Sequence, residues 1–287
     1  MKKHILITGG TGFIASYLVK ELEEAGYLVT SVSRSGNKIT GTHKLDLSNV
    51  YDVDKFIGNI KKIDIIIHCA AIAHGEEPPA EFTIPEFNSL LVKNLVKAFN
   101  YQPHWIFLSS ISVYGYNKQN SFLPLEIYPK TDDPYGRGKL FDENLLISLC
   151  HQLDILRLMP TYDSLDNNDV RKRVFIPKTN IKLKIIPSPL YNLCHIERIK
   201  EAVLVSLENP KGRRIHQVGD KDRIKQKDLI REFNGIYVAI PQIFFRTLLF
   251  ILPKFIKSFK KIRMMLIKLA VPNNYELGSI QLNKKDD

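Results

Sequence analysis

The feature that most constrains the fold is a regular alternation of short apolar segments with longer amphipathic ones over the first 160 residues. The apolar segments lie at residues 4–7, 28–33, 63–68, 105–108 and 153–158. Such short, almost continuously apolar runs are typical of strands that are buried on both faces of a parallel sheet. The intervening segments have helical periodicity, and the first of them, residues 12–25, stops at Gly26. The pattern predicts an α/β fold, a Rossmann-type doubly wound parallel sheet.

The regular alternation of apolar and amphipathic segments ends at residue 162. Prolines 177, 187 and 189 stand among polar loops and short apolar runs, which predicts a small, irregular C-terminal lobe. We therefore expect a first domain at residues 1–162, a second lobe at 163–239 from which the chain crosses back to the first domain, and a terminal segment at 240–287. Helices are expected at residues 196–207 and 227–233.

Composition limits the partners and the compartment. The 287 residues include 41 Lys and Arg against 30 Asp and Glu, a net charge of +11, which favours nucleic acid, phosphorylated small molecules or an acidic membrane surface. Cys69, Cys150 and Cys194 form no CxxC pair, so we expect free thiols and no metal site. The N-terminus has no secretory signal and no apolar run approaches the ~20 residues of a membrane span, which together predict a cytoplasmic protein.

A glycine-rich turn follows the first predicted strand directly. Residues 8–15 read TGGTGFIA, and they lead from the strand into the first helix. Gly9 would permit the tight turn and Gly12 the close approach of a pyrophosphate, while Ala15 suits the position that needs close helix–strand packing. Amide groups at the helix start would hold the negative charge. The turn predicts a dinucleotide site at Gly9, Thr11, Gly12, Phe13 and Ile14; a glycine-rich turn without a ligand is the alternative.

The end of the second predicted strand bears on which dinucleotide binds. An acidic residue here would bind a ribose 2′-hydroxyl, but the sequence reads Ser33-Arg34-Ser35. Arginine suits a 2′-phosphate through charge-assisted hydrogen bonds. Arg34 therefore favours NADP over NAD as the cofactor, and a solvated arginine is the alternative.

A tyrosine and a lysine four residues apart form the candidate catalytic pair. Tyr135 and Lys139 would lie on one face of a helix, where the ammonium would lower the pKa of the phenol from ~10 and allow proton transfer at a carbonyl or hydroxyl centre. Serines 109, 110 and 112 follow an apolar strand about 25 residues earlier, at the strand end where parallel sheets bind ligands. The alternatives are a chance spacing and simple turn chemistry.

These pieces together resemble the extended short-chain dehydrogenase/reductases of the NAD-dependent epimerase/dehydratase family, in its nucleotide-sugar group. The matching segments, in the family's order, are residues 8–15, 45–47, 68–71, 88–94, 109–115, 135–139 and 157–162, with a divergent copy of an HVDD-like segment at 195–198. The resemblance covers residues 4–235 and is strongest up to 162.

The resemblance also implies roles for particular residues. Gly9 and Gly12 would line the pyrophosphate, Asp46 and Leu47 the adenine end, and Ala70 and Ala71 the cofactor's border; Asp46 could instead cap a helix. The implied catalytic residues are Ser110, Tyr135 as acid or base, and Lys139 as its partner on the nicotinamide ribose. The family often forms homodimers through the helices that flank this tyrosine.

Two departures from the family pattern bear on the reaction. Ile111 and Ser112 replace the Asp-Glu pair of 4,6-dehydratases, so dehydration is not expected. What remains is hydride transfer at a sugar carbon, as C4 epimerisation or 4-keto reduction of a nucleotide sugar, as in surface polysaccharide or O-antigen sugar biosynthesis. Arg34 and the compact second lobe favour reduction. The alternatives are a reductase of a non-sugar carbonyl compound and a non-catalytic dinucleotide sensor. The signature of a nucleic-acid-binding module is absent.

The terminal segment is basic and amphipathic. Residues 240–271 contain seven Lys and Arg and no acid, and Phe255, Phe259, Ile262, Leu266 and Leu269 recur at helical spacing. One interpretation is a surface helix that makes peripheral contact with the inner face of an acidic membrane. The alternatives are a helix packed on the protein's own lobe and a subunit contact.

Overall fold

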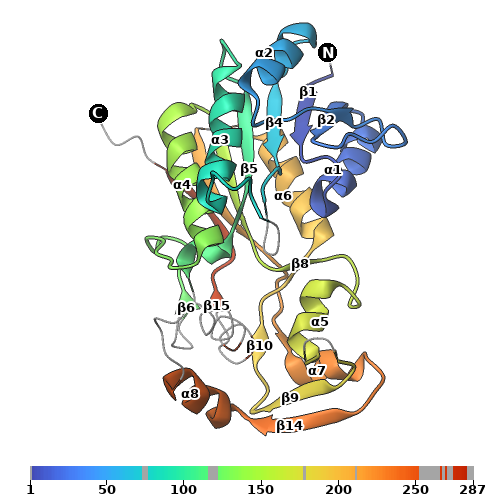
Figure 1. Cartoon of the computed structure of the whole chain (residues 1–287), viewed down its shortest axis with the longest axis vertical. Coiled ribbons are helices and arrows are strands. Elements are labelled where there is room, and N and C mark those ends of the chain that lie inside the picture. Colours follow the sequence, from blue (N-terminus) through green and yellow to red (C-terminus); the bar gives the residue numbers. More distant parts are fainter. Residues whose placement is uncertain are drawn as a thin grey trace.

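The structure is a computed structural model that describes residues 2–72, 77–115, 122–176, 179–210, 212–251, 266, 269 and 274–282. Figure 1 shows the whole chain, with the large sheet and its helices at the N-terminal end and a smaller lobe at the other. The helices are α1 (Phe13–Glu24), α2 (Val50–Asn59), α3 (Ile84–Lys97), η1 (Ile111–Tyr114), α4 (Pro134–Leu149), α5 (Asn168–Val174), α6 (Ile196–Glu208), α7 (Gln226–Arg231) and α8 (Gln242–Ile251).

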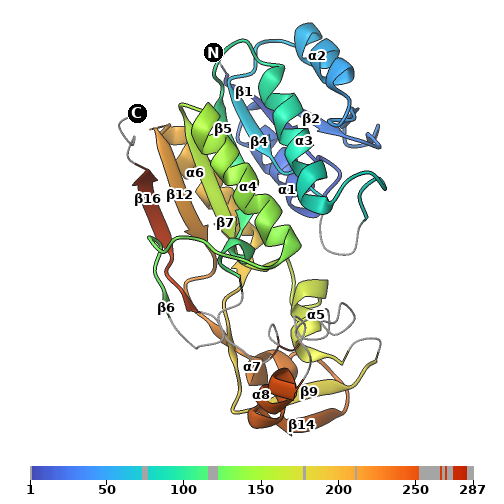
Figure 2. The same ribbon diagram turned by 60° about the vertical axis from the view of Figure 1, so that its left-hand side comes forward.

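One large sheet organises the N-terminal region. Its strand order is β16-β12-β7-β5-β4-β1-β2-β3, and every neighbouring pair is parallel except β12 and β16. The strands are β1 (His4–Thr8), β2 (Leu28–Ser33), β3 (His43–Lys44), β4 (Ile65–His68), β5 (His104–Ser110), β7 (Leu153–Leu158), β12 (Arg213–Val218) and β16 (Gly278–Leu282). Figure 2 shows the sheet from the side of β16. The predicted α/β class and Rossmann-type sheet are confirmed.

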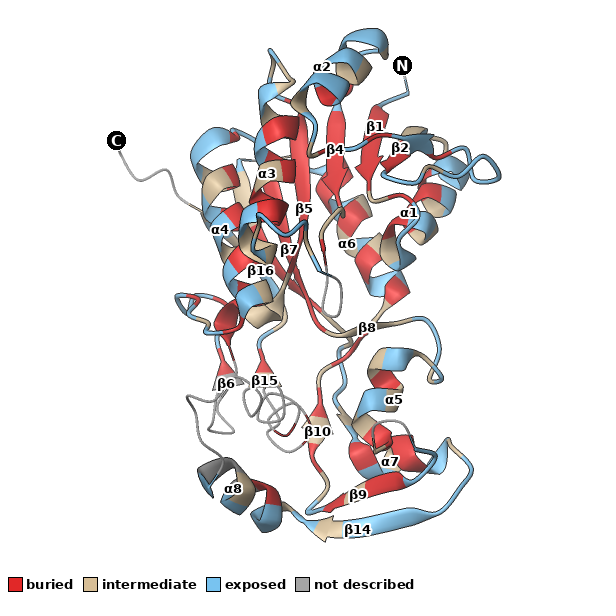
Figure 3. Cartoon of the chain, viewed as in Figure 1, coloured by how far each residue is buried: buried red, intermediate tan, exposed pale blue. Residues whose placement is uncertain are grey.

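Helices cover both faces of this sheet. On one face Ile5 and Ile7 pack in a buried cluster with Leu18 of α1 and Ile199 of α6. On the other face Leu6 and Ile66 pack with residues of α2, α3 and α4, among them Leu91 and Leu146. Successive residues of a strand point to opposite faces, so β1 and β4, which Figure 3 shows buried throughout, bury both sides. Their side chains are apolar except at the strand ends, where His4, Thr8 and His68 stand.

The chain returns to the large sheet twice, at β12 in the middle of the second-lobe sequence and at β16 after it. β12 pairs with β7, and β16 pairs antiparallel with β12 at the edge. Asp154 of β7 links β12 to the neighbouring strands. Its carboxylate accepts hydrogen bonds from His104 of β5 (2.7 Å) and from Arg214 and His216 of β12 (2.7 and 2.6 Å). Burial acts to raise the pKa of Asp154, but these hydrogen bonds outweigh it and hold that pKa well below its usual range. β12 thus carries the chain into the large sheet beside β7.

The second lobe consists of short helices and two-stranded sheets. β9 (Lys182–Ile186) pairs in parallel with β14 (Tyr237–Pro241), and β10 (Leu190–Tyr191) pairs antiparallel with β13 (Ile224–Lys225). β8 (Thr161–Tyr162) and β11 (Cys194–His195) join the lobe to the sheet, while β6 (Phe122–Leu123) pairs with β15 (Asn274–Tyr275). The helices expected at 196–207 and 227–233 are present as α6 and α7.

Part of the basic terminal segment packs on the second lobe. Phe245, Leu266 and Leu269 are buried against Leu183 and Ile185 of β9. These three residues therefore contact the chain's own lobe, while Phe255, Phe259 and Ile262 of the expected helix lie outside the described residues. Within the described chain, no helix is long and apolar enough to cross a bilayer.

Candidate active site

The glycine turn connects β1 to α1 in the expected way. Gly9 has a φ of +73°, which L side chains rarely adopt, and a Cβ on it would lie 3.0 Å from the backbone of Ala70. A Cβ on Gly10 would lie 1.8 Å from Oγ of Ser31 in β2. Gly12 precedes the helix without a side-chain cap, and its N–H donates to the carbonyl of Gly9 at 2.8 Å. The turn is therefore a backbone cradle at a helix start, pressed closely against β2 and the end of β4.

Threonine at the end of β1 fixes the neighbouring loop beside this cradle. Oγ1 of Thr8 accepts hydrogen bonds from the N–H groups of Cys69 and Ala70 at 3.2 and 3.1 Å, and lies 3.0 Å from Nδ1 of His68. Burial, helped by the charge of Lys139, lowers the pKa of His68 to about 3, so the imidazole is neutral. Ala70 and Ala71 are thereby held, half-buried, at the border of the turn, where the resemblance places a cofactor.

The residues assigned to the adenine end lie on the far side of the turn. Arg34 is exposed directly after β2. Oδ1 of Asp46 accepts hydrogen bonds from the N–H and Oγ of Ser48 at 2.9 and 2.7 Å, and Asn49 caps α2. Leu47 is 4% exposed and packs in the core. Asp46 thus stabilises the turn before α2 through these hydrogen bonds, while Leu47 anchors the same turn in the core.

The candidate catalytic residues meet where β5 ends and α4 begins. Asp133 caps α4 by accepting from the N–H of Gly136 at 3.1 Å, and Tyr135 and Lys139 follow one turn apart. Nζ of Lys139 lies 6.0 Å from the centre of the Tyr135 ring. Ser110 ends β5, and its Oγ accepts from the N–H of Ser112 at 3.1 Å. A Cβ on Gly136 would lie 2.2 Å from the carbonyl oxygen of Ser112, so α4 and η1 are in close backbone contact.

The structure corrects the predicted effect of the lysine on the tyrosine. Nζ of Lys139 donates to the carbonyl of Leu108 at 2.8 Å and lies 4.6 Å from the centre of the Phe107 ring. Burial raises the pKa of Tyr135 to about 12, and the negative charges of Asp133, Asp142 and Asp169 add to the rise. Burial also lowers the pKa of Lys139. The phenol is therefore held protonated, because its carboxylate neighbours and burial outweigh the ammonium.

A buried ion pair, which the sequence did not predict, joins α4 to β7 next to these residues. Glu143 lies one turn after Lys139 on α4, and its carboxylate pairs with Arg157 of β7, with Oε2 2.7 Å from Nη2. Ser109 donates to the same carboxylate, and Nη1 of Arg157 donates to the hydroxyl of Tyr114 at 2.6 Å. The spacing of Glu143 from Lys139 placed it on the same helix face and was the available signal.

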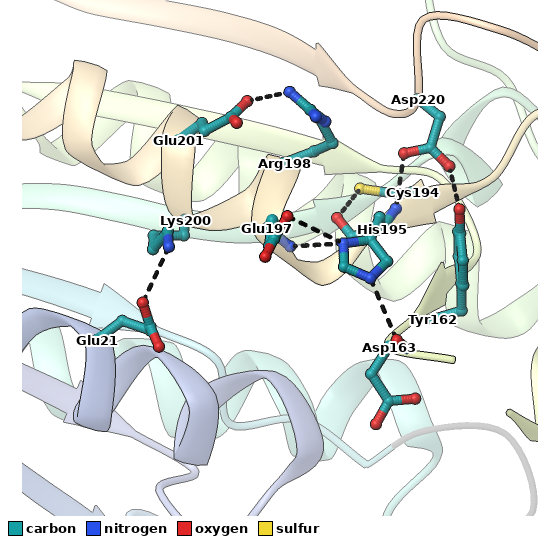
Figure 4. A network of polar contacts seen from close by, with 10 residues as sticks. All are labelled: Glu21, Tyr162, Asp163, Cys194, His195, Glu197, Arg198, Lys200, Glu201 and Asp220. Carbon is teal, nitrogen blue, oxygen red and sulfur yellow. Dashed lines mark hydrogen bonds and ion pairs between the residues drawn. The ribbon is translucent and has the colours of Figure 1, made fainter. Parts of the chain in front are cut away.

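A polar network joins the second lobe to the sheet beside this site (Figure 4). Asp220 accepts hydrogen bonds from the hydroxyl of Tyr162 and the N–H of His195, both at 2.9 Å, and Nε2 of His195 lies 3.2 Å from the carbonyl oxygen of Asp163. Burial and Asp220 raise the pKa of Tyr162 to about 12. The network borders a pocket of about 890 Å³ whose lining includes Arg198 and Arg223. Tyr135 and Lys139 are not among the described residues that line it.

The three cysteines are thiols that burial keeps protonated. Cys69, Cys150 and Cys194 are free thiols, as predicted, and burial raises their pKa values, to about 12 for Cys69 and Cys150. No group of three or more His, Cys, Asp and Glu within the described ranges is arranged to hold a metal ion.

Comparison with known proteins links this geometry to a family. The sequence model of the NAD dependent epimerase/dehydratase family matches residues 5–216. A UDP-glucose 4-epimerase of Dictyostelium discoideum is 32% identical over 171 residues, which cover 51% of this chain and 47% of that protein. A UDP-glucose 4-epimerase of Vibrio cholerae is 25% identical over 257 residues, covering 81% and 75%. The chain thus spans about half the length of the first relative and three quarters of the second.

Solved structures share the fold. The UDP-Glc/GlcNAc 4-epimerase of Campylobacter jejuni superposes with a TM-score of 0.69 at 19% identity, over 83% of this chain and 87% of that one. The UDP-glucose 4-epimerase of Thermus thermophilus, in complex with NAD, superposes with a TM-score of 0.65 at 19% identity, over 83% and 86%. At this level of identity the likeness establishes the fold alone.

Proposed function

Because the chain belongs to the NAD dependent epimerase/dehydratase family, we propose that it is an NAD(P)-dependent enzyme that moves a hydride to or from C4 of a nucleotide sugar. One observation carries the proposal. Ser110, Tyr135 and Lys139 converge where β5 ends and α4 begins, at the same end of the parallel strands as the glycine turn after β1. Ligands of open α/β sheets bind at this edge.

The glycine cradle fits a dinucleotide pyrophosphate. A side chain at Gly9 would crowd the backbone of Ala70, and one at Gly10 would collide with Ser31 of β2, so the backbone N–H groups at the start of α1 are the surface offered to a ligand. Ala70 and Ala71 would border the cofactor, and Asp46 and Leu47 would lie towards its adenine. When bound there, the nicotinamide provides or accepts the hydride.

The protonation of the site suits the reducing direction. With its raised pKa, Tyr135 is a phenol that can donate its proton to a keto oxygen as that carbon receives the hydride, so that a C=O bond becomes CH–OH. Ser110 would hydrogen-bond the same oxygen. Lys139, held by the carbonyl of Leu108, would bind the nicotinamide ribose. Elimination of water would need an acid and a base after Ser110, where Ile111 and Ser112 stand, so dehydration is not proposed.

Two net reactions share this chemistry. The relatives' names support C4 epimerisation, in which oxidation and re-reduction occur on the same bound cofactor. The exposed Arg34 after β2 favours 4-keto reduction with NADPH, because arginine suits a 2′-phosphate and cells commonly run reductions from NADPH.

We also propose a cellular setting. The enzyme would act in the cytoplasm, in surface polysaccharide or O-antigen sugar synthesis, with peripheral contact to the inner membrane face. A homodimer through α3 and α4 is supported by Phe141 of α4, an apolar side chain that is 51% exposed.

Turnover assays test the reaction. The full chain is incubated with UDP-glucose and, separately, with a 4-keto UDP-sugar, each with NAD⁺ or NADPH. Loss of NADPH absorbance with formation of a 4-hydroxy product indicates a reductase; interconversion of C4 epimers without net NADPH loss indicates an epimerase. If neither occurs while a non-sugar ketone is reduced, the nucleotide-sugar proposal is wrong. If the cofactor binds and nothing turns over, the chain is a dinucleotide-binding sensor.

A further inference from the structure

The strand that ends in Ser110 is attached to α4 at two consecutive residues. Nζ of Lys139 donates to the carbonyl of Leu108 at 2.8 Å, and Oγ of Ser109 donates to the carboxylate of Glu143. Lys139 and Glu143 lie one helical turn apart on α4, in line with the candidate catalytic tyrosine one turn earlier. One face of α4 therefore carries the candidate acid, its partner lysine and the carboxylate that binds the strand.

Arg157 of β7 binds the same segment of chain on both sides of its candidate catalytic serine. It stands opposite Ser109 in the register of β5 and β7, and its Nε and Nη2 donate to the carboxylate of Glu143 at 3.1 and 2.7 Å. Its Nη1 donates at 2.6 Å to the hydroxyl of Tyr114, where η1 ends. Ser110 lies between Ser109 and Tyr114 in the sequence, so the ion pair holds the chain before and after it.

This network is buried, and its burial bears on what the charges contribute. The side chains of Arg157 and Glu143 are 4% and 1% exposed, and both Ser109 and Tyr114 are buried. Because two charges lose their water here, apolar residues of similar volume would often stabilise the fold as much or more. A two-point contact between a planar guanidinium and a carboxylate, however, has a fixed geometry. The ion pair can therefore set the distance between the strand end and the helix in a way that apolar packing does not.

The proposed reaction depends on that distance. Ser110 at the end of β5 and Tyr135 on α4 are both expected to contact the same substrate oxygen, and α4 packs across β5 and β7 (Figure 2). A displacement of about 1 Å at the reacting groups can lower a rate by about 10²-fold. Side chains that lock the supporting elements prevent such a displacement.

We propose that Glu143 and Arg157 are positioning residues, which hold the segment with Ser110 at the distance from α4 that hydride transfer requires. The proposal rests on the function proposed above. Neither residue would touch the substrate or the cofactor, so their loss should lower kcat and leave KM and cofactor affinity nearly unchanged. The alternative is that the pair only stabilises the fold, and then any change that restores stability also restores kcat.

A double variant separates position from stability. Glu143→Leu with Arg157→Met replaces the pair by apolar side chains, which should restore most of the stability that a single change removes. We expect a midpoint of urea unfolding close to that of the unaltered chain. We also expect kcat to fall by about 10- to 100-fold, with KM and cofactor affinity within about threefold. The full chain is assayed with the nucleotide sugar that the turnover assays above identify.

Asp154 provides a matched control on the same strand as Arg157. Its side chain is 2% exposed and pairs with Arg214 at 2.7 Å, but it lies near the opposite end of β7 from the candidate active site. Asp154→Asn should lower the midpoint of unfolding and leave kcat within about twofold, because the strand end is not moved.

Ser109→Ala is a milder change at the strand end itself. It removes the hydroxyl that donates to Glu143 and leaves the ion pair intact. It should lower kcat, by less than the double variant does, with little loss of stability. If the double variant does not fold, this variant decides the question, and an unchanged kcat overturns the proposal.

Two further results would overturn it. One is a double variant with both the stability and the kcat of the unaltered chain, and the other is an equal fall of kcat in the double variant and in Asp154→Asn. Amide hydrogen exchange distinguishes these failures from failure of the proposed function. If the unaltered chain turns over no substrate, the proposed function is wrong, and the held geometry is still tested by the amides of residues 109–115. Their exchange should be faster in the double variant and unchanged in Asp154→Asn, and equal exchange in both would mean that the ion pair does not hold the segment.

Discussion

The carboxyl edge of the large sheet and the second lobe both contain arginine–carboxylate pairs, but in very different surroundings. In the pair of Arg157 with Glu143 the side chains are 4% and 1% exposed, and the carboxylate also accepts a hydrogen bond from Ser109. In the pair of Arg171 with Asp166, on and beside α5, they are 37% and 78% exposed. The N–O distances, 2.7 and 2.6 Å, are nearly equal. Distance alone therefore does not tell which charges hold the active site in place, whereas burial does.

The largest expected effect comes from removing one hydroxyl at the sheet edge. Tyr135→Phe should lower kcat by about 10³-fold, because a general acid contributes about 10² to 10⁴. Affinity for the cofactor, measured by fluorescence titration, should remain within about twofold. Tyr191→Phe is the matched change in the second lobe, where the buried hydroxyl donates to the carbonyl of Leu269 at 2.9 Å. It should leave kcat nearly unchanged and lower the free energy of unfolding by about 1 kcal/mol. Retained activity in Tyr135→Phe would exclude the proton-transfer role.

The two arginine pairs give the next largest difference. Glu143→Gln leaves the buried Arg157 charge without its counter-ion and should lower the free energy of unfolding by about 3–5 kcal/mol. Asp166→Asn should change it by less than about 1 kcal/mol, because water screens the exposed pair. Urea unfolding, followed by circular dichroism, measures both. Similar values for the two variants would contradict the distinction by burial.

The sequence predicted the sheet well and the electrostatics of the site poorly, for one physical reason. A strand such as residues 28–33 is specified by its own side chains, so its bounds could be read locally. The strand at 278–282 is a partly exposed, polar edge strand, and its pairing with β12 depends on contacts some 65 residues away. Likewise the spacing of Tyr135 and Lys139 placed both on α4. The raised pKa of Tyr135 depends on burial and on Asp169, which no local pattern contains.

The buried histidine at the sheet edge should make stability depend on pH. In the unfolded chain His68 binds a proton as the pH falls through about 6.5, but in the folded chain it does so only near pH 3. The unfolded state therefore binds more protons between these values, and stability falls as the pH falls. From pH 7 to pH 5 this group alone should lower the free energy of unfolding by about 2 kcal/mol.

A variant isolates the contribution of this histidine. His68→Gln removes the titrating group but retains a polar partner for Thr8. Asp142, whose pKa burial raises to about 6, acts in the opposite direction over the same range in both proteins, so it cancels in the comparison. The stability advantage of the unaltered chain over the variant should shrink by about 2 kcal/mol between pH 7 and pH 5. Parallel pH profiles would mean that His68 is not held neutral by the fold.

The smallest expected effect concerns the choice of cofactor, and it also compares the two regions. Arg34 is exposed after β2, where a 2′-phosphate would lie, and a charge-assisted hydrogen bond there is screened by water. Arg34→Asp should therefore shift the ratio of NADPH to NADH affinity towards NADH by only about tenfold, or ~1.4 kcal/mol. Arg223→Asp, an equal change of charge at an exposed position beside the pocket of the second lobe, should leave that ratio unchanged. Equal shifts in the two variants would attribute the preference to the overall charge of the protein, and no shift in either would mean that Arg34 does not contact the cofactor.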